Sequence, residues 1–108
     1  MDKTTVVNAL SALAHPIRLD AFRLLVQAGP EGLTPGVLVE QLGVPYAKLG
    51  FHLKELSIAG MVTQEQSGRN VIYRAAYDRM NELLAFLTQN CCQGVTKKAP
   101  KASPVCGC

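Results

Sequence analysis

Apolar positions in the first quarter of the chain recur at the three- and four-residue spacings of helices. The first stripe is formed by Val6, Leu10, Leu13 and Ile17. It predicts an amphipathic helix that runs up to His15-Pro16. A second helix is expected from Pro16 to residues 29–32, because the missing N–H of a proline has no partner in a first helical turn anyway. Its broad apolar stripe consists of Ile17, Leu19, Phe22, Leu24, Leu25 and Val26.

Two shorter helices separated by a glycine are predicted next. Thr34 has the side chain of an N-cap, Pro35 suits the first helical position, and Gly43 ends that helix. Val44-Pro45 opens the following helix, which closes at Ala59-Gly60. Its apolar residues, spaced four and three apart, are Leu49, Leu53 and Leu56. Two short helices joined by a glycine-containing turn are typical of a helix-turn-helix.

Beyond Gly60 the pattern changes to that of strands. Residues 61–66 and 70–75 are rich in strand-forming residues, and Ser67-Gly68-Arg69 between them supplies the turn of a hairpin. The chain becomes helical again from about Tyr77-Asp78. The apolar stripe of this last helix consists of Met80, Leu83, Leu84 and Leu87. The predicted fold class is therefore mainly α with a small β-hairpin, a winged helix-turn-helix in the order α-α-α-α-β-β-α.

Composition indicates one domain with a tail. The chain has 108 residues, of which 48% are apolar, enough for one modest core. We expect a winged helix-turn-helix DNA-binding and dimerisation domain over residues 1–90. Residues 91–108 are expected to form a flexible, cysteine-containing, inducer-binding tail, because residues 96–104 lack periodicity and large apolar groups. A chain this short is expected to hide surplus apolar helix surface in a homodimer.

The composition also bears on location and partners. The net charge of +3 favours an anionic partner only if the cations gather on one surface. The N-terminus has no cationic region followed by an apolar stretch, and no window approaches 18 uninterrupted apolar residues. We therefore expect a soluble, cytoplasmic protein with no membrane partner.

Three segments resemble the ArsR/SmtB family of metalloregulatory repressors. They are residues 13–19, residues 51–62 and residues 67–73. Their order and spacing carry the resemblance, which spans roughly residues 5–90. It implies a homodimer joined through the first and last helices. Such a dimer binds operator DNA when it is metal-free and releases the DNA when the inducer binds.

The second helix of the helix-turn-helix carries the candidate DNA contacts. With Leu53 on the buried side and about 100° per residue, its outer face is predicted to present Ala47, Lys48, Phe51, Lys54, Glu55 and Ile58. Lys48 and Lys54 are candidates for phosphate or base contacts, and Arg69 at the wing tip for a flanking backbone or minor-groove contact. His52 is expected to pack or hydrogen-bond between this helix and the wing rather than bind metal.

The start of this helix departs from the family. Where the family usually has small or hydroxyl residues, this chain has Tyr46, Lys48 and Gly50. A glycine inside a helix costs about 1 kcal/mol relative to alanine and has no side chain to touch DNA. We therefore predict that the helix recognises a different operator, or its own operator weakly. The predicted DNA-binding set is Tyr46, Ala47, Lys48, Phe51, Lys54 and Arg69.

All four cysteines lie in the last eighteen residues of the chain. They are Cys91, Cys92, Cys106 and Cys108. In a reducing cytosol such thiols favour metal binding or redox chemistry over a disulfide framework. Thiolates select soft ions, and arsenite exchanges three oxygens for three sulfurs. Neighbouring residues on a helix point about 100° apart, so Cys91 and Cys92 converge on one atom only if the helix ends or loosens there.

The cysteine pair also resembles a subgroup of arsenic-responsive repressors, which use vicinal cysteines at the end of the last helix and a third cysteine downstream. This resemblance implies that Cys91 and Cys92 bind As(III), or alternatively Sb(III), together with Cys106 or Cys108. Other placements used in the family are not expected. Residues 33–42 contain no cysteine, and Asp78 and Glu82 have no histidine partner after His52 for a zinc-type site on the last helix.

Two alternatives to an arsenic sensor remain open at this point. Four thiols also suit Zn(II), Cd(II) or Pb(II), and the pairs suit oxidation as a redox switch. A thiol-dependent redox enzyme is the competing class, but such enzymes use a C-x-x-C pair at a helix start, whereas the pairs here are C-C and C-x-C. The chain also has no glycine-rich phosphate loop, no H-E-x-x-H sequence and no Ser/His/Asp set. We therefore do not expect an enzyme.

Overall fold

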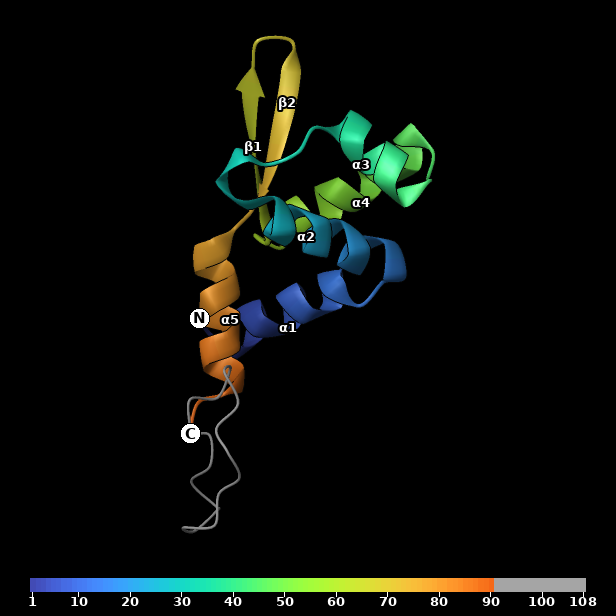
Figure 1. Ribbon diagram of the computed structural model, residues 1–108. Helices are drawn as coiled ribbons and strands as arrows, with labels where there is room; N and C mark the ends of the chain where they lie inside the picture. Colours follow the sequence, from blue (N-terminus) through green and yellow to red (C-terminus); the bar gives the residue numbers. More distant parts are fainter. Residues whose placement is uncertain (91–108) are drawn as a thin grey trace.

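The elements of the chain follow the predicted order (Figure 1). The computed structural model describes residues 1–90, so the tail and its four cysteines lie outside the described residues. The helices and strands are α1 (Lys3–Leu13), α2 (Pro16–Ala28), the 3-10 helix η1 (Gly29–Glu31), α3 (Pro35–Leu42), α4 (Tyr46–Ile58), β1 (Val62–Ser67), β2 (Asn70–Ala75) and α5 (Tyr77–Leu87). The winged helix-turn-helix fold class is confirmed. Within residues 1–90 no helix is both long and apolar enough to cross a membrane.

Side-chain capping sets the starts of α2 and α3. The imidazole Nδ1 of His15 accepts a hydrogen bond from the N–H of Ile17 at 3.2 Å, which starts α2. The hydroxyl of Thr34 accepts one from the N–H of Val37 at 3.4 Å, which starts α3 as predicted. Gly43 ends α3 in the left-handed conformation, with φ 66°. Because Gly43 has no Cβ, the chain turns there into α4 without strain.

The core lies where α2, α3 and α4 meet, and the start of β1 closes it. Its largest fully buried side chains are Leu25, Leu38, Leu49, Leu53, Leu56 and Met61. Three of them are the leucines that the spacing within α4 predicted to face inward. Burying such a side chain stabilises the fold by about 1.5 to 3 kcal/mol, so this cluster holds the two helices of the helix-turn-helix together.

The predicted apolar stripe of α1 is wrong at Leu10. The structure buries Val6, Ala9 and Ala12, whereas Leu10 is 40% exposed. The reason is that α1 packs against α2, α4 and α5, and alanines allow helix backbones to approach more closely than leucines do. The apolar stripe predicted for α2 is likewise wrong at Leu19, which is exposed.

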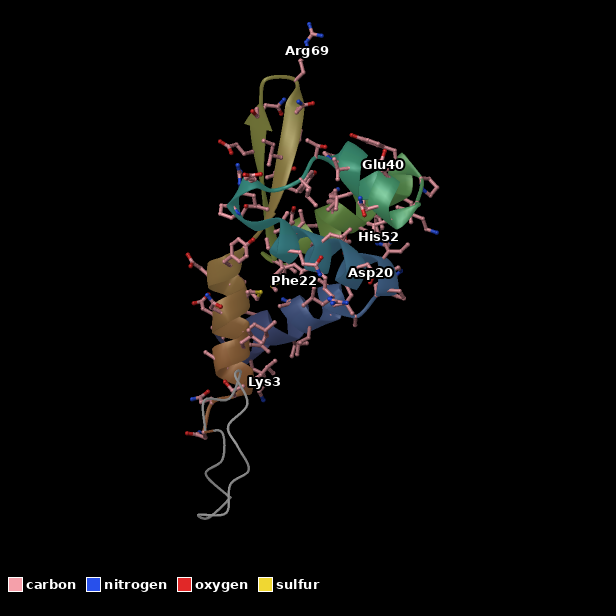
Figure 2. All side chains as sticks on the ribbon, viewed as in Figure 1. Lys3, Asp20, Phe22, Glu40, His52 and Arg69 are labelled. Carbon is pink, nitrogen blue, oxygen red and sulfur yellow. The ribbon has the colours of Figure 1, made fainter. Side chains whose placement is uncertain are left out.

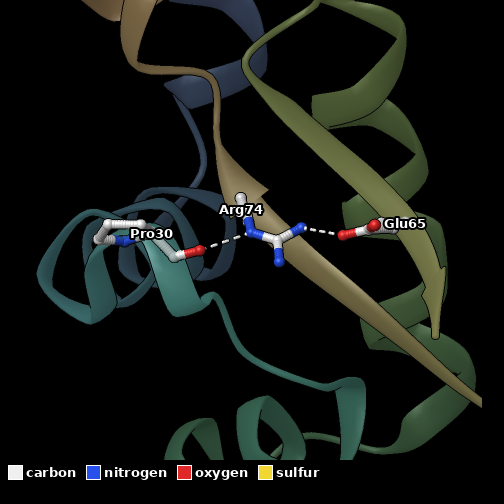
Figure 3. Close-up of polar contacts among 3 residues, drawn as sticks. All are labelled: Pro30, Glu65 and Arg74. Carbon is white, nitrogen blue, oxygen red and sulfur yellow. Dashed lines mark hydrogen bonds and ion pairs between the residues drawn. The ribbon is translucent and has the colours of Figure 1, made fainter.

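The wing is bound to the linker between α2 and α3. Strands β1 and β2 pair antiparallel, and Leu33 and Tyr73 exchange backbone hydrogen bonds of 2.9 and 2.8 Å. The guanidinium of Arg74 donates to the carbonyl of Pro30 at 2.6 Å and pairs with the carboxylate of Glu65 at 2.7 Å (Figure 3). These contacts fix the angle of the hairpin relative to the helix-turn-helix.

Helix α5 lies beside α1, at the end of the domain away from the wing (Figure 1). Of the stripe predicted for α5, Leu83 is buried and Met80 is half-buried, but Leu84 and Leu87 are exposed. Within residues 1–90 the neighbouring helices cover only part of the apolar face of α5. Together with Val7 and Leu10 of α1, these leucines leave apolar side chains of both helices uncovered within residues 1–90.

Candidate nucleic-acid interface

Helix α4 presents the outer face that helical geometry predicts. Its leucines point into the core, while the predicted contact residues Tyr46, Ala47, Lys48, Phe51 and Lys54 are all exposed. Ile58 is exposed as well, and Glu55 is half-buried. The five predicted contact residues on α4 are therefore all accessible, and of the wider predicted outer face only Glu55 is partly covered.

The sixth predicted contact, Arg69, lies in the turn between β1 and β2. Gly68 precedes it with φ 61°, a backbone conformation that glycine adopts easily. Figure 2 shows the side chain of Arg69 extending away from the tip of the hairpin. Of the predicted contact cations, the structure thus places Arg69 at the tip of the wing and Lys48 and Lys54 on α4, with the hairpin angle set by the linker contacts.

The charge of the described domain is balanced. Of the eleven Lys and Arg residues, Lys97, Lys98 and Lys101 lie in the tail, so residues 1–90 hold eight cations and all eight carboxylates. The net charge of +3 therefore does not belong to the domain that carries the interface. Any attraction for a polyanion has to come from where individual cations lie, because the domain has no overall positive field.

His52 is the buried polar residue of α4, and its partner was predicted wrongly. The residue is 4% exposed, and its hydrogen bond and its ring contact with His15 are made at the start of α2 instead of with the wing. Nδ1 of His52 accepts a hydrogen bond from Nε of Arg18 at 3.1 Å, and the ring lies 4.4 Å from that of His15. Burial lowers the pKa of His52, and the nearby His15 and Arg18 lower it further. The neutral ring thus ties α4 to the start of α2.

Arg18 is the residue at this surface that the periodicity of the sequence did not single out. Besides donating to His52, its guanidinium carbon lies 5.6 Å from the centre of the Phe51 ring. The hydrogen bond with His52 joins residues 34 positions apart in the chain. Helical periodicity within α2 predicts only that Arg18 lies off the apolar stripe, so no local pattern would have found this pairing.

The candidate metal ligands cannot be placed in the same way. Cys91, Cys92, Cys106 and Cys108 all lie outside residues 1–90. Within that range no three His, Cys, Asp or Glu side chains gather closely enough to hold a metal ion. The last described residues show that α5 ends at Leu87 and that Asn90 has a left-handed φ of 61°.

Comparison with known proteins adds a sequence match over the same motif. A family model described as a helix-turn-helix domain matches residues 13–65. The HTH-type transcriptional repressor SmtB of Mycobacterium tuberculosis is 42% identical over 67 residues, which cover 62% of this chain and 47% of SmtB. The chain thus spans about half the length of the curated relative that it matches.

Two solved structures share the fold. An ArsR-like transcriptional regulator from Rhodococcus sp. RHA1 superposes with a TM-score of 0.72 at 22% identity, over 84% of this chain and 83% of that one. A homodimeric winged helix-turn-helix DNA-binding domain from Mycobacterium bovis superposes with a TM-score of 0.65 at 22% identity, over 93% and 89%. At this identity the two structures establish the winged helix-turn-helix fold.

Proposed function

We propose that this chain is a member of the ArsR/SmtB family of helix-turn-helix transcriptional regulators and acts as a cytoplasmic repressor that binds operator DNA. The helix-turn-helix match over residues 13–65 and the 42% identity to the repressor SmtB support this proposal, and the winged helix-turn-helix fold agrees with it. The observation that carries the proposal is the outer face of α4, where Lys48, Phe51 and Lys54 are exposed on the second helix of the motif. In such motifs the second helix enters the major groove. Arg69 on the wing would then contact the backbone or minor groove beside it.

The apolar side chains left exposed on α1 and α5 support a homodimer. These are Val7, Leu10, Leu84 and Leu87. They belong to two neighbouring helices at the end away from the wing, so a second copy that covers them leaves both α4 helices accessible (Figure 1). The similar domain from Mycobacterium bovis is homodimeric. A two-fold dimer would present two recognition helices to half-sites about 34 to 36 Å apart.

The inducer in this proposal is As(III), or Sb(III), bound by Cys91, Cys92 and either Cys106 or Cys108. The support is the number, position and chemistry of the thiols, since soft thiolates select thiophilic ions. The pair follows shortly after α5, one of the two helices of the proposed dimer contact. Binding there would alter the distance between the two α4 helices and weaken simultaneous contact with both half-sites. Coupling of this kind is typically worth about 1 to 3 kcal/mol.

A second inducer class is favoured by the count of cysteines. Arsenite uses three sulfurs, but the chain has four. Four thiolates are a common ligand set for Zn(II), and they also suit other thiophilic divalent ions. A repressor that senses Cd(II), Zn(II) or Pb(II), or oxidation of the cysteine pairs, is therefore the alternative.

The test measures release of operator DNA. An operator is first selected from a random duplex pool, and release is then followed while As(III), Sb(III), Cd(II), Zn(II), Pb(II) or peroxide is added to the full chain. We expect As(III) to weaken binding by about 5- to 150-fold, the range of typical coupling energies. The Cys91→Ser, Cys92→Ser double variant should bind the operator normally and no longer respond.

Single variants identify the third ligand. Cys106→Ser and Cys108→Ser are matched to each other, and we expect one of them to lose the response while the other keeps it. Release of DNA from the double variant by As(III) would reject the cysteine site. Failure to select any operator would reject the repressor itself.

A further inference from the structure

Phe51 is a large apolar side chain in an unusual place. It is 55% exposed on α4, three residues from Lys48 on one side and three from Lys54 on the other. Residues three apart lie on the same helix face, so the ring sits between two exposed cations in the middle of the proposed DNA-binding face. The free domain leaves much of the apolar surface of this ring in contact with water.

Two neighbours hold the Phe51 ring in one orientation. The guanidinium of Arg18, on α2, lies over the ring at 5.6 Å. The imidazole of His52 meets it edge-on, with the ring centres 5.4 Å apart and the planes 63° apart. Arg18 itself is fixed by its hydrogen bond to His52. A side chain that is already oriented loses little rotamer freedom on binding, so contact with a partner costs little entropy.

Two of the residues next to Phe51 offer no side-chain hydrogen bonding to bases. Ala47 lies one turn before it and Gly50 directly before it, and neither has a polar side chain. Adding a Cβ to Gly50 would meet nothing within 4 Å, so this part of the helix surface is open. In the major groove the apolar feature of a base edge is the C5-methyl group of thymine, whereas the other features are hydrogen-bond donors and acceptors.

We propose that Phe51 is a specificity-determining residue that packs on a thymine methyl group in each operator half-site. The inference rests on the proposed function, and it deepens that function by naming the chemical class of base that α4 prefers. Lys48 and Lys54 would contact phosphates on either side of this position, and Arg18 would keep the ring facing the groove. The sequence preference then comes from an apolar contact instead of a hydrogen bond.

The test removes the methyl group alone. The thymines of the selected operator are replaced by uracil, one symmetry-related pair at a time. Uracil keeps every hydrogen-bonding atom, and affinities are measured for the full chain at one fixed salt concentration. We expect one symmetric pair of positions at which the wild-type protein loses about 15-fold in affinity. This value corresponds to roughly fourfold for each buried methyl group in two half-sites.

The Phe51→Ala variant closes a double-mutant cycle between protein and DNA. It should bind equally well to duplexes with thymine or uracil at the sensitive pair of positions. Phe51→Leu keeps an apolar side chain and should retain part of the preference for thymine. Ile58→Ala is the matched control, because Ile58 is an apolar side chain of the same helix, 71% exposed, near its C-terminal end. This control should keep the full preference for thymine.

The outcomes separate the two proposals. A protein that selects no operator overturns both the repressor and the thymine contact. A protein that binds its operator but tolerates uracil at every position, or whose Phe51→Ala variant keeps the preference, overturns the thymine contact and leaves the repressor standing.

Discussion

Replacing Lys54 with glutamine is expected to change how steeply DNA binding falls with salt. Each phosphate that a cation neutralises contributes about −0.9 to the slope of log affinity against log salt. If Lys48, Lys54 and Arg69 each contact one phosphate, a dimer makes about six contacts and has a slope near −5.4. Between about 50 and 200 mM salt its affinity should fall roughly 2,000-fold.

The Lys54→Gln variant removes one contact from each half of the dimer. Its slope should become about −3.6, so the same increase in salt should lower its affinity only about 150-fold. Residues 1–90 carry as many carboxylates as cations, so the domain has no net charge of its own. The slope of log affinity against log salt therefore depends on which individual side chains contact phosphates. Lys54 is exposed and forms no ion pair in the part of the chain that the structure covers.

The assay is fluorescence anisotropy of a labelled operator over a salt series. Lys3→Gln is the matched control, since it removes the same charge from α1, at the other end of the domain from Arg69 (Figure 2). The control should keep the wild-type slope. The reasoning is refuted if Lys54→Gln keeps the wild-type slope, or if Lys3→Gln lowers the slope as much as Lys54→Gln does.

Three further predictions concern stability. Gly50→Ala should raise the free energy of unfolding by about 0.5 to 1 kcal/mol, since the new Cβ has open space and the helix gains a better helix former; a lower urea midpoint would contradict this. Gly32→Ala should lower it by about 2 kcal/mol, because φ is 70° and the Cβ would lie 2.5 Å from the carbonyl oxygen of Tyr73; an unchanged midpoint would show that the linker shifts easily. Because the pKa of folded His52 is below its ordinary 6.5, the unfolded chain binds the extra proton and stability should fall as the pH drops below 6.5. Denaturant titrations between about pH 8 and 5 should show a shallower fall for His52→Gln than for the wild type, and equal slopes would argue against the buried neutral ring.

Local chemistry was sufficient to predict the order of the elements and the outer face of α4. The N-cap at Thr34 and the stop at Gly43 act through neighbouring backbone atoms, so they operate wherever the segment lies. The four- and three-residue spacing from Leu49 to Leu56 fixes which side of α4 is buried, and therefore which side is exposed. The cysteine hypothesis rests on the position of the thiols along the chain and on the family resemblance, and it stays a prediction.

Contacts between distant segments followed from the tertiary structure alone. Periodicity placed Leu10 on the buried face of α1. The close approach of the neighbouring helices instead favours the small Ala9 and Ala12 on that face. The pairing of Leu33 with Tyr73 in the wing depends on how the linker meets the hairpin, which no spacing along the chain encodes.

The candidate interface also combines features set by local sequence with contacts set by the tertiary structure. The exposed positions on α4 follow from one helix and its period, and the prediction holds for each of them except Glu55, which is half-buried. Arg18 contacts His52 and Phe51, which lie 34 and 33 positions further along the chain. These contacts arise only when the core brings α2 against α4. Capping and periodicity act over a few residues, so the local sequence determines them. The partner of a side chain on a distant element depends on how all the elements pack together.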